Sequence, residues 1–264
     1  MNLELQGKSA VVTGSTAGIG LAIAAALARE GASVVVNGRT EARVKAAVDT
    51  IRKQTKDAQV RGVAADTGTA AGCAAVVRSA PDTEILVNNL GTYAVKPFEE
   101  IADADWMNMF EVNVMSGVRL ARHYLPGMRK RNWGRVIFIS SESGQQIPPE
   151  MVHYGMTKAA QVAIARGIAE SVAGTQITVN SVLVGPTASE GLTHFVSSVA
   201  KERGLTPADI EKEFFKSVRP TSLLKRFQTV EEIADVVAFV AGNRSLAING
   251  AAVRAEGGVV RSIL

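Results

Sequence analysis

The sequence predicts an α/β protein in which helices cover both faces of a doubly wound parallel sheet of about seven strands. Short runs rich in β-branched residues alternate with alanine-rich stretches of helical length. This alternation is typical of successive βα units, whose strands lie parallel. The runs are almost continuously apolar, as expected of strands covered on both faces. With 47% apolar residues the chain can fill one large core, so we expect a single domain spanning residues 1–264.

Seven segments are predicted to be strands: residues 9–13, 33–37, 60–64, 85–88, 135–140, 177–182 and 252–255. Six are predicted to be helices: residues 19–30, 41–54, 69–79, 105–131, 152–173 and 230–241. The last helix has the clearest limits, because Thr229 and Glu232 form a capping box before it and Gly242 follows it. In a sheet of this kind, ligands bind at the carboxyl ends of the strands, where the strand order reverses.

Residues 189–227 interrupt the alternation, since they contain no predicted strand and directly follow the sixth one. One amphipathic helix is expected from apolar side chains at helical spacing: Leu192, Phe195, Val196 and Val199. A second is expected after the N-cap Thr206, with apolar side chains near one face: Ile210, Phe214 and Phe215. Two such helices predict a lid that closes over a substrate. A packed surface excursion or a subunit contact is the alternative.

Charge and cysteine content exclude several classes of function. The net charge of +4 is spread along the chain, with its densest cluster at residues 129–131, so no nucleic-acid partner is expected. The single Cys73 cannot form an internal disulfide, and no group of Cys and His has the spacing of metal ligands. The sequence has no run of about 18 apolar residues, so no membrane-spanning segment is expected. Because the first strand already begins at Ser9, we expect no targeting peptide and a cytoplasmic protein.

A glycine-rich turn, T-G-S-T-A-G-I-G at residues 13–20, joins the first predicted strand to the first predicted helix. Phosphate binding at such a turn needs a tight bend, close backbone approach and free N–H groups at a helix N-terminus. Three glycines supply the first two requirements: Gly14, Gly18 and Gly20. Ser15 and Thr16 add hydroxyl donors. A turn without a ligand is the alternative, and the position between strand and helix favours nucleotide binding.

Tyr154 and Lys158 lie four residues apart in a predicted helix, so their side chains share one face. A free tyrosine has a pKa of about 10, which a nearby ammonium lowers, so the pair can relay a proton. Such a pair also arises by chance on helices. Ser141 ends the strand before this helix, where its hydroxyl can hydrogen-bond a substrate carbonyl, whereas Ser140 should point to the opposite side.

The spacing T-G-x-x-x-G-I-G, followed by Ser141, Tyr154 and Lys158 in this order, resembles the short-chain dehydrogenase/reductase family from about residue 7 to residue 258. The resemblance implies a Rossmann-type sheet with a nicotinamide dinucleotide across the carboxyl ends of its strands. It implies that the three residues are catalytic and that Asn113 anchors a water near the lysine. Glu142, which follows the serine, is expected to be a loop charge.

The same resemblance implies the cofactor contacts, which include the catalytic Tyr154 and Lys158. The pyrophosphate and ribose cradle is expected from the turn: Gly14, Ser15, Thr16, Gly18, Ile19 and Gly20. The other expected contacts follow later strands: Asp66, Thr67, Asn89, Gly91, Gly185 and Thr187. Asp66 is also a candidate helix N-cap. Leu90 and Val184 depart from the family pattern, which usually has alanine and proline at these positions.

The second strand is followed by Gly38 and Arg39, where enzymes that use NAD normally have an acidic residue. A guanidinium can pair with the 2′-phosphate of NADP, and no carboxylate is present to repel it. Ala17 stands where many NADP-using members have a second basic residue. The sequence therefore favours NADP(H) over NAD(H).

The expected reaction is hydride transfer between the nicotinamide and a carbonyl or secondary alcohol with a sizeable apolar part. A narrower alternative is a 3-oxoacyl-carrier-protein reductase. The basic residues 129–131 could attract its acidic carrier protein, although Thr175 replaces an arginine that is frequent in such reductases. A regulator that senses the dinucleotide without turnover is an alternative of another class. The resemblance also implies a homotetramer built on residues 105–131 and 152–173.

Overall fold

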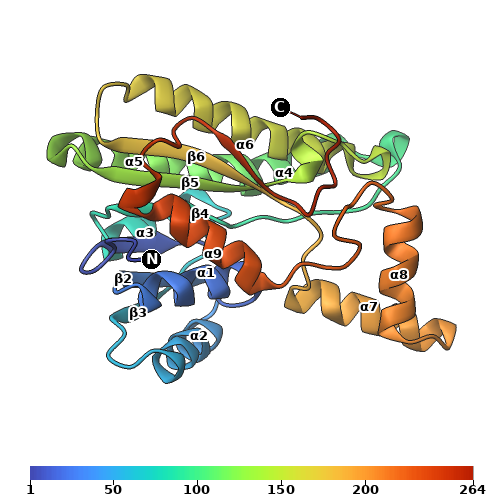
Figure 1. The fold of residues 1–264 in the computed structure, drawn as a ribbon. Helices are drawn as coiled ribbons and strands as arrows, with labels where there is room; N and C mark the ends of the chain where they lie inside the picture. The colour runs from blue at the N-terminus through green and yellow to red at the C-terminus, as the bar shows by residue number, and fades with distance from the viewer. Residues whose placement is uncertain (264) are drawn as a thin grey trace.

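The computed structural model describes residues 1–263 and contains a seven-stranded sheet in the order β3-β2-β1-β4-β5-β6-β7 (Figure 1). All neighbouring strands pair in parallel. The strands are β1 (Ser9–Val12), β2 (Ser33–Gly38), β3 (Val60–Ala64), β4 (Ile85–Asn88), β5 (Gly134–Ser141), β6 (Ile177–Val184) and β7 (Ala252–Ala255). The order reverses between β1 and β4, so this is a Rossmann-type sheet with its switch point there. The predicted fold class is confirmed.

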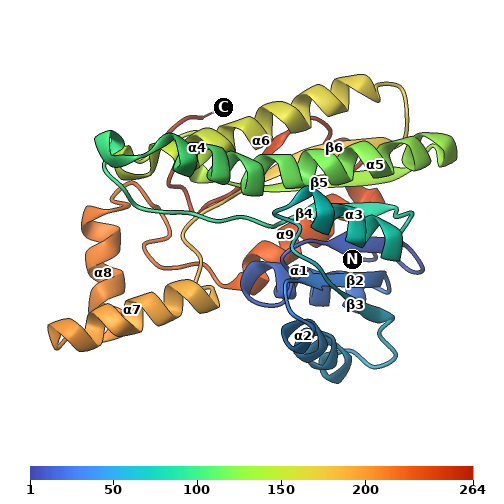
Figure 2. The same ribbon diagram turned by 180° about the vertical axis from the view of Figure 1, so that it is seen from behind.

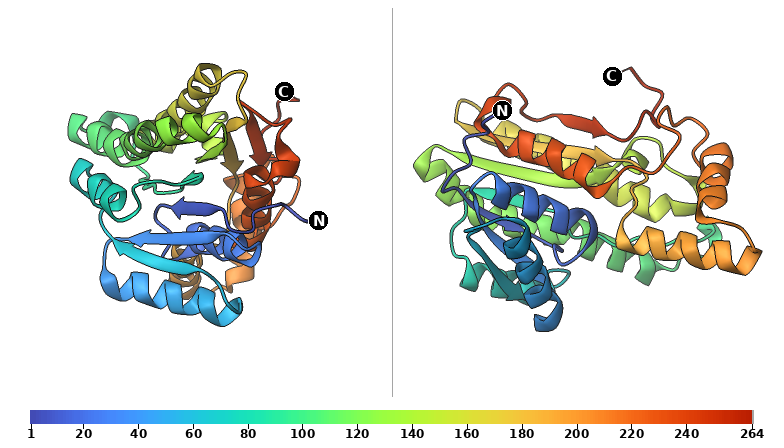
Figure 3. Two further views of the ribbon diagram at one scale, coloured as in Figure 1. Left: turned by 90° about the vertical axis from the view of Figure 1, so that its left-hand side faces the viewer. Right: turned by 60° about the horizontal axis from the view of Figure 1, so that its bottom comes forward.

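Helices cover both faces of the sheet (Figure 3). They are α1 (Gly18–Arg29), α2 (Glu41–Gln54), α3 (Ala70–Ser79), α4 (Asp103–Phe110), α5 (Ser116–Arg131), α6 (Val152–Ser171), α7 (Glu190–Arg203), α8 (Pro207–Ser217) and α9 (Val230–Ala241). Neighbouring strand residues pack on opposite faces: Val12 belongs to the core under α1, α2 and α9, and Val11 to the core under α3, α5 and α6. The continuous apolar runs of the sequence reflect this double burial.

The helix predicted over residues 105–131 is wrong as a single element. It begins earlier, at Asp103, and a π-helical segment at Glu111–Met115 separates α4 from α5. π-Helical segments are rare in proteins, and those that occur often lie at functional sites. This one carries Asn113. Elsewhere the predicted ends of strands and helices agree with the structure to within two residues.

The helices α7 and α8 project from the layered body (Figures 1 and 2). Thr206 is the N-cap of α8, as the sequence predicted, and Asp209 completes a capping box there. The apolar side chains of the two helices mainly pack on one another, with Val196 and Ile210 in one small core, while Phe195 is 60% exposed. The expected apolar inner face of a lid is therefore not what the structure shows. Within residues 1–263, no helix is long and apolar enough to cross a membrane.

Candidate active site

The glycine-rich turn between β1 and α1 has the backbone that phosphate binding requires. Gly14 and Gly18 adopt left-handed conformations with φ of 59° and 54°. A Cβ atom on Gly20 would lie 2.4 Å from the carbonyl oxygen of Gly14, so α1 approaches the loop closely only without a side chain there. Within the described residues no side chain caps α1, whose N-cap is Ala17. Its first N–H groups are therefore available to an anion, which fits the pyrophosphate of a dinucleotide.

Ser15 lies inside the protein instead of facing a phosphate. Its hydroxyl donates to the carbonyl oxygen of Val12 (2.7 Å) and accepts from the N–H of Asn37 (2.9 Å). The Asn37 side chain in turn donates to the carbonyl oxygens of Val63 (3.1 Å) and Ala65 (3.0 Å). These bonds hold the ends of β1, β2 and β3 together. The expectation that Ser15 supplies a hydroxyl donor to the cofactor is therefore not met.

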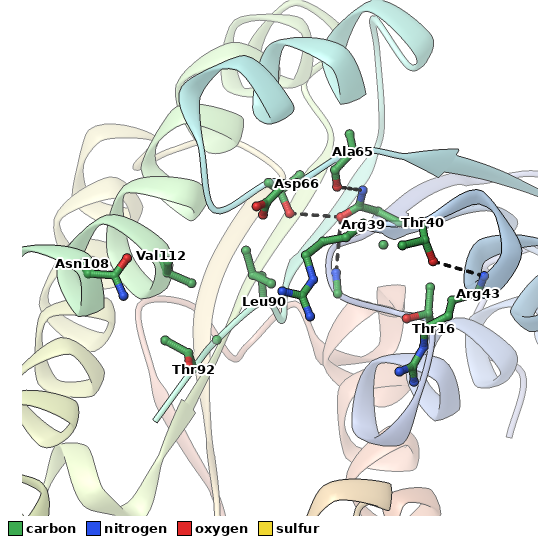
Figure 4. A pocket seen from close by; sticks show the side chains of 15 residues that line it. Thr16, Arg39, Thr40, Arg43, Ala65, Asp66, Leu90, Thr92, Asn108 and Val112 are labelled. Carbon is green, nitrogen blue, oxygen red and sulfur yellow. Dashed lines mark hydrogen bonds between the residues drawn. The ribbon is translucent and has the colours of Figure 1, made fainter. Parts of the chain in front are cut away.

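A cavity of about 630 Å³ lies at the carboxyl ends of β1 to β4, at the switch point of the sheet. Several predicted cofactor contacts line it: Gly14, Thr16, Arg39, Asp66, Thr67 and Gly91. Figure 4 shows the Arg39 side chain reaching into this cavity between Leu90 and Thr16. A second guanidinium, that of Arg43, also lines the cavity and pairs with Glu190 of α7 (2.9 Å). The end of β2 therefore presents positive charge to the cavity.

Asp66 and Thr67 follow β3 at the edge of the cavity. Asp66 accepts from the N–H of Gly68 (3.0 Å), and the Thr67 hydroxyl donates to Asn37 (3.0 Å). The N-cap of α3 is Thr69, so Asp66 does not have the alternative role of a helix cap.

The segment after β4 closes the cavity on the side of Lys158. Asn89 donates to the carbonyl oxygen of Gly14 (3.0 Å) and so fastens this segment to the glycine-rich turn. Leu90 and Gly91 line the cavity. A Cβ atom on Gly91 would lie 3.5 Å from Nζ of Lys158, so this lysine lies close to the end of the cavity that Gly91 lines.

An unpaired buried acceptor, on the segment before α9, lies beside the turn after β6. A Cβ atom on Gly185 would lie 2.5 Å from the carbonyl oxygen of Glu256 and 2.7 Å from Oε1 of Gln228. Thr187 is buried and donates to the carbonyl oxygen of Gly185 (2.9 Å). Oε1 of Gln228 is buried and has no hydrogen-bond partner among the described residues. Because buried acceptors are normally paired, this position fits an N–H donor such as a carboxamide.

Ser141, Tyr154 and Lys158 meet beside this cavity. Ser141 is the last residue of β5, and its hydroxyl hydrogen-bonds Tyr154 of α6. Nζ of Lys158 lies 5.5 Å from the centre of the Tyr154 ring and donates to the carbonyl oxygen of Ile139 (2.8 Å). Ser140 points away and donates to the backbone of Lys158 (2.8 Å). The structure thus brings together the three groups that the sequence singled out.

Burial shifts the pKa values of both acid–base groups. It raises the pKa of Tyr154 well above its usual value, the nearby Glu142 adds to this, and the Ser141 hydrogen bond opposes it. Burial also lowers the pKa of Lys158 to about 8. The expected lowering of the tyrosine pKa by the lysine is therefore contradicted, because desolvation dominates here.

Asn113 lies in the π-helical segment and holds the loop over the lysine. Its side chain accepts from the N–H of Thr92 (2.7 Å) and donates to the hydroxyl of Thr157 (3.0 Å). The backbone carbonyl oxygen of Asn113 accepts from Nε2 of Gln161 (2.7 Å), and Oε1 of Gln161 accepts from Nζ of Lys158 (3.2 Å). Gln161 therefore connects the two predicted residues. It was not among the predicted site residues, although its spacing places it on the same helical face as Tyr154 and Lys158.

Glu142 was expected to be a loop charge, and the structure contradicts this. The carboxylate is buried, accepts from the hydroxyl of Ser141 and pairs with Arg219, which follows α8 (3.0 Å). The ion pair joins the active site to the segment that follows the projecting helices. No local sequence pattern relates two residues 77 positions apart, although a carboxylate next to the predicted catalytic serine was a signal to follow.

A glycine-rich anion site, a cavity at the switch point and a Ser–Tyr–Lys cluster define a dinucleotide-binding protein with an acid–base centre. The short chain dehydrogenase family model matches residues 8–199. The chain is 47% identical to an uncharacterized oxidoreductase, YvaG, of Bacillus subtilis, and the match covers 100% of both chains. It is 30% identical to a 3-oxoacyl-[acyl-carrier-protein] reductase of Aquifex aeolicus, over 98% of this chain and 100% of that one.

Among solved structures, it is similar to L-sorbose reductase from Gluconobacter frateurii in complex with NADPH and L-sorbose. That match has 34% identity and a TM-score of 0.91, and it covers 100% of both chains. The chain therefore belongs to the short-chain dehydrogenase/reductase family. It is an oxidoreductase with a fold that binds a nicotinamide cofactor.

Proposed function

We propose that the protein transfers hydride between NADP(H) and a carbonyl or secondary alcohol. The observation that carries this proposal is the meeting of Ser141, Tyr154 and Lys158 at the end of β5, beside the cavity at the switch point. A regulator without turnover has less support, because all three catalytic groups and Asn113 are present and connected.

The proposed cofactor site follows the cavity from the adenine to the nicotinamide end. The backbone of the turn holds the pyrophosphate with Gly14, Thr16, Gly18, Ile19 and Gly20. Asp66 and Thr67 flank the adenine, and Asn89 and Gly91 position the ribose. Gly185 and Thr187, with the unpaired oxygen of Gln228, hold the carboxamide. When bound, the cofactor supplies or accepts the hydride.

In the proposed reduction, Ser141 hydrogen-bonds the substrate oxygen and Tyr154 donates its phenolic proton to that oxygen. The raised pKa of Tyr154 keeps this proton in place at neutral pH. Lys158 holds the nicotinamide ribose, and its ammonium stabilises the tyrosinate formed. Gln161 and Asn113 fix the position of the ammonium.

NADP(H) is the preferred cofactor in this proposal. Gly38 leaves no carboxylate at the end of β2, and Arg39 reaches into the cavity (Figure 4). NADPH is bound in the similar L-sorbose reductase structure, which supports the same choice. A guanidinium beside the adenine ribose pairs with a 2′-phosphate.

A 3-oxoacyl-carrier-protein reductase has weaker support. The basic cluster at residues 129–131 ends α5 three residues before β5 begins, so it lies at the amino edge of the sheet, opposite the active site. Arg131 also pairs with Asp82 (2.8 Å), and Arg129 donates to the backbone of Ser171 (2.9 Å). A carrier protein bound there would not face the catalytic residues.

We also propose a homotetramer. The helices that would form its core, α4 with α5 and α6, lie over one face of the sheet (Figures 1 and 2). Light scattering measures the assembly directly.

A panel of small ketones, each with NADPH or NADH, tests the proposed activity. We expect oxidation of NADPH with at least one ketone and loss of this rate in Tyr154→Phe, with cofactor binding unchanged. The proposal would be overturned if the purified wild-type protein binds NADPH but catalyses neither its oxidation with any ketone nor its formation from NADP with any alcohol.

A further inference from the structure

The carboxylate of Glu142 is part of the active site. One of its oxygens accepts from the hydroxyl of Ser141, and the other accepts from Nε of Arg219 (3.0 Å). The two charged side chains are only 6% and 12% exposed. Any substrate oxygen that binds Ser141 therefore lies next to a buried carboxylate.

Two acceptors compete for the single hydroxyl proton of Ser141: the Glu142 carboxylate and the substrate oxygen. In the structure this proton is donated to Glu142, while the oxygen of Ser141 accepts from the N–H of Ser143 (3.1 Å). In the proposed reduction, the same proton must instead be donated to the substrate oxygen. The carboxylate oxygen of Glu142 then loses its donor, and a buried charged acceptor without a donor is costly.

We propose that the substrate replaces this donor with a hydroxyl group on the carbon next to the reacting carbonyl, so that the enzyme prefers α-hydroxy ketones and vicinal diols. This inference rests on the proposed function and specifies its substrate class. A hydroxyl group at that position donates to Glu142 at the moment when Ser141 turns to the carbonyl. A substrate with a carboxylate at that position cannot replace the donor, because an ionised carboxylate has no proton to donate to the free oxygen of Glu142.

The surroundings of the ion pair leave room for such a substrate. A cavity of about 470 Å³ lies between residues 146–150 and residues 217–219, and Arg219 lines it. Its lining combines the apolar Ile147 and Val218 with polar side chains such as Gln146. A small polar ketone therefore has room beside Arg219, the partner of Glu142.

Three probes separate the contributions of shape, hydrogen bonding and charge. Hydroxyacetone and 2-butanone differ only in a hydroxyl in place of a methyl group, and acetoacetate carries a carboxylate. With NADPH, we expect kcat/KM for hydroxyacetone to exceed that for 2-butanone by at least about tenfold, the effect of one hydrogen bond to a charged group. Acetoacetate should be the poorest of the three.

Glu142→Gln tests the residue itself, since glutamine keeps the size but loses the charge and can also donate. We expect the ratio of kcat/KM between hydroxyacetone and 2-butanone to fall about tenfold, and turnover of acetoacetate to rise. Using a ratio within each variant cancels any general effect of the change on Ser141. The matched control is Glu213→Gln, which removes an exposed ion pair with Arg203 and should leave the ratio unchanged.

The outcomes distinguish this inference from the proposed function. Equal kcat/KM for hydroxyacetone and 2-butanone in the wild type, or an unchanged ratio in Glu142→Gln, would overturn the inference while the oxidoreductase activity stands. A protein that turns over none of the probes or any other ketone, although it binds NADPH, would overturn both.

Discussion

Replacing Arg39 with alanine should selectively weaken NADPH binding. The guanidinium is exposed but reaches into the cavity, where a 2′-phosphate would lie next to it (Figure 4). Hydrogen bonds between charged partners contribute about 1.5–3 kcal/mol, and solvent exposure places this contact at the lower end. We therefore expect a loss of about 1.5–2 kcal/mol, a roughly ten- to thirtyfold increase in the Kd for NADPH. The Kd for NADH, which has no 2′-phosphate, should not change.

Titration calorimetry with both cofactors measures this difference. Arg43→Ala is the matched control: its guanidinium lines the same cavity but pairs with Glu190 at 2.9 Å, so its removal should cost less than the removal of Arg39. Gly38→Asp introduces the missing carboxylate, but its Cβ atom would lie 2.3 Å from Cγ2 of Thr16. It should therefore be combined with Thr16→Ala and compared with Thr16→Ala alone. An unchanged ratio of the two Kd values in Arg39→Ala would refute the reasoning.

Three further predictions concern acid–base chemistry, the glycine-rich turn and assembly. Burial lowers the pKa of Lys158 to about 8, so its ammonium is lost above that pH, and a pH–rate profile at saturating NADPH should fall as the pH rises through about 8. Unfolding would not explain this fall: the unfolded lysine binds its proton up to about pH 10.5, so the contribution of Lys158 to stability rises with pH between about 8 and 10.5. A rate independent of pH up to 10 would contradict this role. Gly20→Ala should lower the free energy of unfolding by about 1–3 kcal/mol and weaken NADPH binding, because its Cβ atom would collide with the carbonyl oxygen of Gly14. Gly191→Ala is its control in thermal melts, since a Cβ atom there meets nothing within 4 Å, and equal effects of the two changes would refute the explanation. Light scattering should give about four times the 27.8 kDa of one chain, and a monomer mass would disprove the tetramer.

Local patterns in the sequence were sufficient for most of the fold. Each strand is a short apolar run between turn residues, and the capping boxes at Thr206 and Thr229 mark two helix starts that the structure confirms. The π-helical segment at Glu111–Met115 was not predictable, because its residues continue the helical pattern on both sides. The segment also makes tertiary hydrogen bonds, such as that between Asn113 and Thr92, which no local pattern shows.

The meeting of Ser141, Tyr154 and Lys158 was predictable from the strand-end serine and the four-residue spacing of the other two, together with the family resemblance, because the spacing alone also arises by chance. The pairing of Glu142 with Arg219 was not predictable, because the two residues are far apart in the sequence and meet only inside the folded protein. The inward hydroxyl of Ser15 also depends on a neighbouring strand, which contributes the N–H of Asn37. Interactions between distant segments are the part that spacing alone cannot reveal.

The most direct test of the central claim compares wild type and Tyr154→Phe in two assays on the same preparations. The change removes one hydroxyl group from the half-buried side chain that would donate the proton. We expect ketone-dependent NADPH oxidation to fall by about 10²–10⁴-fold, the usual contribution of a positioned acid, while the Kd for NADPH and the melting temperature stay close to those of the wild type. A variant that binds NADPH normally and reduces ketones at the wild-type rate would contradict the assignment of Tyr154 as the proton donor.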